Sequence, residues 1–226
     1  MRVLRTARAA SAALLLFYCA GAASAQQANG LERDMIVGAE RGEIATLRAA
    51  LADGARINAR DQRGRSALLA ATQRNEIDVA RFLIREGADV DAKDFVQDSP
   101  FLNAAAEGRI EILKLILGAN PDLKDINRER NTALILAAHH GRVEAVNLLL
   151  ATKIDRDQVN NLGWTALLQA VIAGDGSPAQ TEIVRRLVDG GADVNIADRD
   201  GVTALAHAKR AGYTEMVRIL GEARAH

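Results

Sequence analysis

The sequence predicts an all-α protein: a stack of about six helix-turn-helix units joined by β-hairpin-like tips. Three observations predict this fold. A polar turn residue recurs every 33 positions, a Ser or Thr follows it by five positions, and two apolar stretches with helical spacing come next. Aromatic residues make up only 3% of the 226 residues, so the core must be aliphatic, which suits closely stacked helices.

The turn residues and the hydroxyl residues keep one register along the chain. The turn residues are Asp61, Asp94, Asn127 and Asn160, spaced by 33, and Asp198, which follows after 38. The hydroxyl residues are Ser66, Ser99, Thr132, Thr165 and Thr203. Each hydroxyl is expected to cap a short, Ala-rich first helix by accepting a hydrogen bond from a backbone N–H.

The second helix of each unit is expected to end at a residue in the left-handed conformation. Glycine tolerates this conformation best, and it stands there as Gly54, Gly87 and Gly191. Asn120 takes the place in one unit and Lys153 in another, where we expect a strain of about 1 kcal/mol.

These features resemble the ankyrin-repeat family, whose 33-residue unit has a turn and two helices and begins T-P-L-H-x-A. The matching segments are Ser99-Pro100-Phe101-Leu102-Asn103-Ala104, Gly87-Ala88-Asp89-Val90 and Gly191-Ala192-Asp193-Val194. One unit keeps the proline and none keeps the histidine. The resemblance implies a stack that binds proteins without catalysis.

The register divides the chain into seven segments. We predict a cleaved signal peptide at 1–25, an N-terminal capping repeat at 31–60 and ankyrin repeats at 61–93, 94–126, 127–159 and 160–197, with a C-terminal capping repeat at 198–226. An insert at 175–181 is expected to lengthen the turn between the two helices of its unit. It is either a binding element or a tolerated surface insertion.

The first 25 residues have the three parts of an export signal. Arg2, Arg5 and Arg8 precede an apolar run, and Ala23-Ser24-Ala25 provides small residues for cleavage after Ala25. We therefore expect a periplasmic or secreted protein without stable membrane insertion after cleavage; an uncleaved anchor and a lipoprotein at Cys19 are the alternatives.

Composition argues against several function classes. The net charge is zero, and −3 once the three arginines of the signal are removed, which disfavours nucleic acid as a partner. The only cysteine lies in the signal. We found no phosphate-binding, zinc-protease or serine-hydrolase motif. His139-His140 lacks further ligands for zinc, so we expect no metal, no cofactor and no catalytic residue.

Binding is expected on the concave surface formed by the tips and the ends of the first helices. Trp164 and the Phe95-Val96 pair stand out as large apolar residues, although each could instead pack against a neighbouring unit. The candidate protein-binding residues are Arg63, Arg65, Arg74, Phe95, Val96, Gln97, Glu107, Arg128, Arg130, His139, His140, Leu162, Trp164 and Arg210.

The leading hypothesis is a monomeric, non-catalytic scaffold outside the cytoplasm that binds a protein partner. The alternatives are an inhibitor or immunity-type protein acting on a toxic enzyme and a factor in peroxide defence. An enzyme or a metal protein is the least favoured class, because it would need a cleft of convergent acids or histidines.

Overall fold

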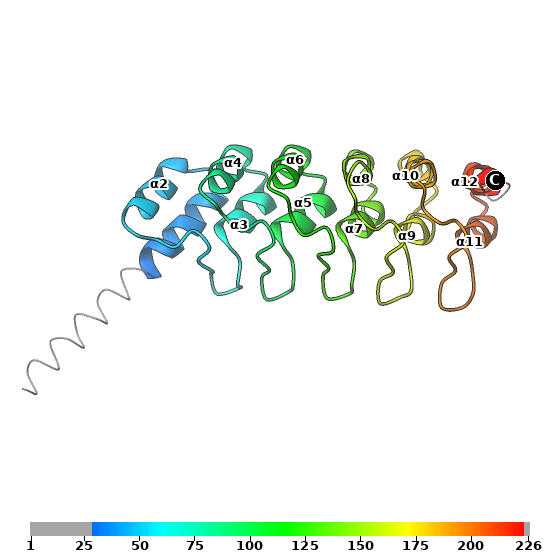
Figure 1. Ribbon diagram of the computed structural model, residues 1–226, viewed down its shortest axis with the longest axis horizontal. Coiled ribbons are helices and arrows are strands. Elements are labelled where there is room, and N and C mark those ends of the chain that lie inside the picture. Colours follow the sequence, from blue (N-terminus) through cyan, green and yellow to red (C-terminus); the bar gives the residue numbers. More distant parts are fainter. Residues whose placement is uncertain (1–28, 224–226) are drawn as a thin grey trace, which may run out of the picture.

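The computed structural model describes residues 29–223, which fold into twelve helices arranged as six pairs (Figure 1). The first pair is a helix over residues 29–40 and α2 (Ile44–Ala52). The others are α3 (Ala67–Arg74) with α4 (Ile77–Arg85), α5 (Pro100–Glu107) with α6 (Ile110–Gly118), α7 (Ala133–His139) with α8 (Val143–Leu150), α9 (Ala166–Ile172) with α10 (Pro178–Asp189), and α11 (Ala204–Ala211) with α12 (Thr214–Ala223). The predicted all-α repeat stack is confirmed.

The pairs stack in two layers. The first helices α3, α5, α7, α9 and α11 pack side by side in one layer, and the second helices α4, α6, α8, α10 and α12 form the other. Five hairpin tips extend from the same side of the first-helix layer (Figure 1). Only isolated bridges, Ile126 with Thr132 and Ala197 with Thr203, join strand-like segments in the described residues. The tips and the first helices therefore form one elongated surface.

The predicted hydroxyl caps are present at all five positions. Each side chain accepts a hydrogen bond from the backbone N–H three residues ahead, as Ser66 does from Leu69 at 3.1 Å and Thr165 from Leu168 at 3.2 Å. Ser99, Thr132 and Thr203 do the same. These bonds fix where the first helix of each of these five units begins, and hence the orientation of the tip before it.

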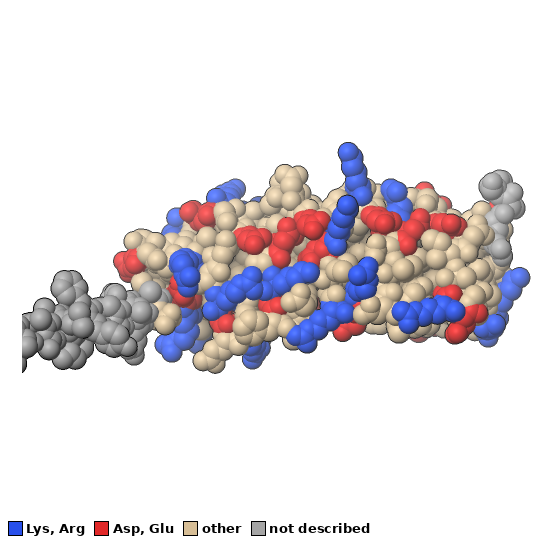
Figure 2. Space-filling model, turned by 60° about the horizontal axis from the view of Figure 1, so that its bottom comes forward, with Lys and Arg blue, Asp and Glu red and all other residues tan. Residues whose placement is uncertain are grey.

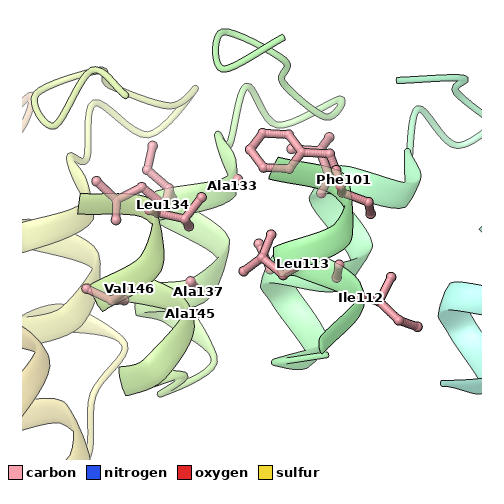
Figure 3. Close-up of a cluster of buried hydrophobic side chains, with 14 of the residues drawn as sticks. Phe101, Ile112, Leu113, Ala133, Leu134, Ala137, Ala145 and Val146 are labelled. Atoms are coloured by element: carbon pink, nitrogen blue, oxygen red, sulfur yellow. The ribbon is translucent and has the colours of Figure 1, made fainter. Parts of the chain in front are cut away.

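The core runs continuously between the layers (Figure 3). Phe101 on α5 and Leu134 on α7 point toward each other's helices and are fully buried. Alanines such as Ala137 and Ala145 lie between the larger side chains, so adjacent helices approach closely. Each buried Leu or Phe contributes about 1.5–3 kcal/mol of transfer free energy. This core makes the stack a rigid support for its tips.

Second helices end as predicted in four units and differently in one. Gly54, Gly87, Gly191 and Asn120 have positive φ. Lys153 does not, so the predicted strain there is wrong. The reason is Thr152, whose hydroxyl accepts a hydrogen bond from the Ile154 N–H at 3.1 Å and turns the chain without a left-handed residue.

The insert at 175–181 does more than lengthen a turn. Ser177 caps α10 through the Gln180 N–H at 3.4 Å, and Pro178 is the first residue of a 12-residue helix. The loop before it is tied to the last unit, because the Tyr213 hydroxyl donates to the Gly174 carbonyl at 3.0 Å. The turn between the two helices is longer, as predicted, and spans residues 173–177, while the rest of the insert, from Pro178, forms the first turn of α10.

The predicted signal peptide lies outside the described residues. Within residues 29–223, none of the helices has the length and apolar character needed to cross a membrane.

Candidate protein-binding surface

Every hairpin tip is built around the side chain of its turn residue. One Oδ1 atom accepts hydrogen bonds from the backbone N–H groups two and four residues ahead. For Asp61 the donors are Arg63 at 2.8 Å and Arg65 at 2.9 Å, and for Asp94 they are Val96 and Asp98, both at 2.9 Å. Asn127, Asn160 and Asp198 repeat the pattern. Asp or Asn at this position is thus required by the tip itself.

Long side chains and backbone groups connect one tip to the next. Arg60 donates to the Lys93 carbonyl, and Lys93 Nζ donates to the Ile126 carbonyl at 2.7 Å. Further along, the Asn161 N–H donates to the Glu129 carbonyl at 2.8 Å. The tips are therefore held as a row, and binding a partner would require little ordering of the surface.

Phe95 packs against its neighbour and is also exposed. Its N–H donates to the Arg63 carbonyl at 3.0 Å, and its ring lies over Gly64, where an added Cβ would come within 2.7 Å of the ring. Arg128 donates to the Phe95 carbonyl. The residue as a whole is still 63% exposed. Both interpretations of Phe95, packing and contact, thus agree with the structure.

Other predicted tip residues are more open. Val96 and Leu162 are exposed to 58% and 54%, at matching ends of the second and fourth tips. Gln97 and Arg130 have φ of 65° and 61°, at positions where the other three tips carry glycine. Two tips therefore carry a non-glycine residue in a strained backbone conformation, and its side chain is exposed.

The charged candidates fall into two groups. Arg63, Arg74, Glu107, Arg128, Arg130 and Arg210 are exposed. Arg65 is not a free contact residue: its side chain is 12% exposed and its guanidinium lies 2.7 Å from Glu40 and 2.8 Å from Asp61. The structure gives Arg65 a structural role that the sequence analysis did not separate from binding.

A groove of about 380 Å³ lies between the tips and first helices of the fourth and fifth units. Its apolar wall is formed by Leu162, Trp164 and Ile172. Trp164 is half-buried and packs against the core, so it lines the groove as a fixed wall. Predicted residues from two units, His139 and Trp164, are thereby brought together.

A chain of amide side chains forms the groove's polar wall. Asn160 Nδ2 donates to Asn131 Oδ1 at 2.9 Å and lies 3.4 Å from Gln169 Oε1, while Gln169 Nε2 is 2.7 Å from His139 Nδ1. Asn160 and Gln169 are buried, which fixes the positions of the groove's polar atoms. The His140 ring packs edge-on against His139, and burial followed by the charge of His139 lowers the pKa of His140.

The second tip contains a partly buried carboxylate, Asp98, beside a second acid. Burial, followed by the negative charge of Asp94, raises the pKa of Asp98 to about 6, although Asn103 Nδ2 donates to it at 2.9 Å. At the matching position of the first tip stands Arg65. There, burial raises the pKa of Asp61, but the hydrogen bonds from Arg65 and Arg63 and the Arg65 charge lower it overall.

Several of these residues were missed by sequence reasoning. Asp98, Asn131, Asn160 and Gln169 were not proposed, yet they shape the surface. A signal was present: Asn103, Gln169 and His207 stand nine residues after a turn residue, on first helices that are otherwise mostly apolar. His207 does bond to its turn residue, with Nε2 2.7 Å from Asp198 Oδ2.

Charge on this side of the molecule is sorted into rows. Figure 2, which brings the tip side forward, shows acidic groups in a row along the stack and basic groups in a second row beside it. In the described part of the chain, no three His, Cys, Asp or Glu side chains are grouped so as to hold a metal ion.

Comparisons with known proteins define the class of this structure. Residues 101–195 match the family description of ankyrin repeats in three copies, and residues 63–95 match that of an ankyrin repeat. The chain belongs to the ankyrin-repeat family, whose members are typically non-catalytic modules that bind proteins.

Two solved structures are similar over nearly their whole length. An ankyrin repeat domain from Acinetobacter baumannii AYE has 45% identity and a TM-score of 0.82, covering 85% of this chain and 98% of its own. The ankyrin repeat protein EF0377 has 36% identity and a TM-score of 0.80, covering 84% and 97%. No curated protein matches the chain.

Proposed function

We propose that this ankyrin-repeat chain is a scaffold or adaptor that acts outside the cytoplasm and binds a protein partner through its tips and concave helix face. The observation that carries the binding surface is the row of connected tips bearing exposed Val96, Phe95 and Leu162 beside the Trp164 groove. Exposed apolar residues on a rigid, polar-rimmed surface are typical of protein contact sites.

Affinity capture with matched variants tests the binding surface. The bait is the chain from Gln26 to His226, used as wild type, as an Arg130→Ala, Leu162→Ser variant and as an Arg85→Ala control. Arg130 and Leu162 are exposed on tips, whereas Arg85 is exposed at the end of α4 in the other layer. We expect a protein retained by the wild type and the control and lost with the tip variant. Retention by all three baits would move the site off the tips.

The proposal of export rests only on the sequence of residues 1–25, which has a positively charged start, an apolar run and small residues before the expected cleavage site. N-terminal sequencing of the protein from fractionated bacterial cells tests it. A chain that starts at Gln26 in the periplasm or medium supports export, and a chain that keeps Met1 in the cytoplasm refutes it.

A further inference from the structure

The second tip holds an excess of hydrogen-bond acceptors, which we name the acceptor corner: Asp94, Asp98 and Asn103. Asp94 is only 5% exposed and Asp98 is partly buried. Asn103 donates to Asp98 Oδ2 and leaves its own Oδ1 without a donor. Among residues 29–223, no Lys, Arg or His lies within ion-pair distance of either carboxylate.

In the other four tips the turn residue either has a basic side chain as its partner or carries no charge. In the first tip Arg65 Nη2 lies 2.8 Å from Asp61 Oδ2, and in the last His207 Nε2 lies 2.7 Å from Asp198 Oδ2. The third and fourth tips use Asn127 and Asn160, which carry no charge. Each of these tips gives its turn carboxylate a side-chain hydrogen-bond donor or carries an uncharged Asn, whereas the second tip adds another acid, Asp98.

The groove lies farther along the same face. Positions 98, 131 and 164 are equivalent in three consecutive units, so Asn131 lies between the acceptor corner and Trp164. Glu129 lines the groove and has no ion pair within the described range. The face from the second to the fourth tip therefore joins an apolar groove to carboxylates that form no ion pair with any cation of residues 29–223.

We propose that this face binds an extended segment of a protein partner that carries a Lys or Arg side chain within a few residues of a large apolar side chain. The cation contacts the Asp98 carboxylate, the more exposed acid of the acceptor corner, and the apolar side chain enters the groove beside Leu162 and Trp164. This inference rests on the proposed protein-binding function. Charge-assisted hydrogen bonds and a buried apolar anchor are the contacts that dominate recognition of this kind.

The probe is a random-peptide library displayed on phage and selected on the folded chain from Gln26 to His226 at pH 7.5. We expect peptides with Lys or Arg close to a large apolar residue to be enriched. On an Asp98→Asn chain the preference for Lys and Arg should disappear, and an enriched peptide should bind about tenfold more weakly. On a Leu162→Ser chain the apolar preference should be lost while the basic one remains.

Asp200→Asn is the matched control, because Asp200 is an exposed acid on the last tip and the same substitution there should change neither preference. Circular dichroism confirms the fold of each variant. Enriched peptides without a basic preference, or a preference unchanged by Asp98→Asn, would overturn the inference and leave the binding surface intact. A selection that enriches nothing would also overturn it, and the capture experiment would then decide separately whether the tips bind a folded partner.

Discussion

The first and second tips have the same backbone but different chemistry. In the first, Asp61 is paired with Arg65 and the left-handed position holds Gly64. In the second, Asp98 stands where Arg65 stood, Gln97 occupies the left-handed position, and Phe95 and Val96 replace Gln62 and Arg63. Asp98 and Gln97 make the second tip less stable, and Phe95 and Val96 give it an exposed apolar surface.

This contrast separates residues that form the tip from residues that use it. Both tips keep the turn residue and the hydroxyl cap, which supply the hydrogen bonds of the turn and helix. The side chains at the positions that differ do not form these hydrogen bonds. Departures from local stability rules at such positions are typical of functional surfaces, so the second tip is where we expect contact with a partner.

The largest effect should come from removing the charge of Asp98. Its folded-state pKa of about 6 lies above an unfolded value of about 3.9, so the folded state binds the proton more tightly. Ionisation of Asp98 therefore lowers the free energy of unfolding. This loss is complete above about pH 6 and disappears as the pH falls toward about 4. Asp98→Asn should raise the free energy of unfolding by about 2–3 kcal/mol at pH 7.5 and by about 1 kcal/mol at pH 4.5. Urea unfolding at both pH values measures the difference, and a gain independent of pH would contradict the account.

Arg65→Ala should have the opposite sign in the first tip. It leaves Asp61 and Glu40 without their cation in a mostly buried site, so we expect a loss of about 2 kcal/mol of unfolding free energy at pH 7. Arg63→Ala is the control, since Arg63 is exposed on the same tip and its loss should cost less than about 0.5 kcal/mol. Equal losses in the two variants would show that Arg65 does not stabilise the tip.

Gln97→Gly should stabilise the chain by about 1 kcal/mol, because glycine adopts the observed φ of 65° without a Cβ penalty. Gln62→Gly makes the same substitution in the first tip, at a residue without positive φ, and should cost a few tenths of a kcal/mol through the more flexible unfolded chain. Thermal unfolding of both variants decides whether the left-handed residue is strained.

Val96→Ala should change the unfolding free energy by less than about 0.5 kcal/mol, because Val96 is 58% exposed. Val90→Ala, the same change at a residue 7% exposed just before the second tip, should cost about 2 kcal/mol. A large loss with Val96→Ala would assign Val96 to packing and weaken the surface it helps to define.

Sequence predicted the parts of this structure that repeat. Ser66 and its four equivalents begin helices, and Gly54, Gly87, Gly191 and Asn120 end them, because local hydrogen bonding and backbone sterics decide both. The predicted left-handed conformation at Lys153 was wrong, because the Thr152 hydroxyl accepts a hydrogen bond from the Ile154 N–H and the chain turns without it. The position of a residue in the repeat does not show which of several adjacent polar groups will form a hydrogen bond.

The candidate surface was predicted in part. Leu162, Val96 and Phe95 were identified as large apolar residues on tips, and they are exposed. The role of Arg65 depends on a contact with Glu40 in the first unit, which the 33-residue pattern does not compare with Arg65, so only the structure reveals it. The hydrogen bond between Asn103 and Asp98 lies within one unit, and the spacing of Asn103 from its turn residue could have indicated it, but the burial of Asp98 depends on the packed structure.

The central claim is that the second tip carries a carboxylate left for a partner's cation. Carbon-detected NMR titration of the Asp98 carboxyl group tests it most directly. We predict a pKa near 6 in the free chain, and a lower one once a selected basic peptide is bound. An ordinary pKa near 4 in the free chain, unchanged by the peptide, would contradict the account.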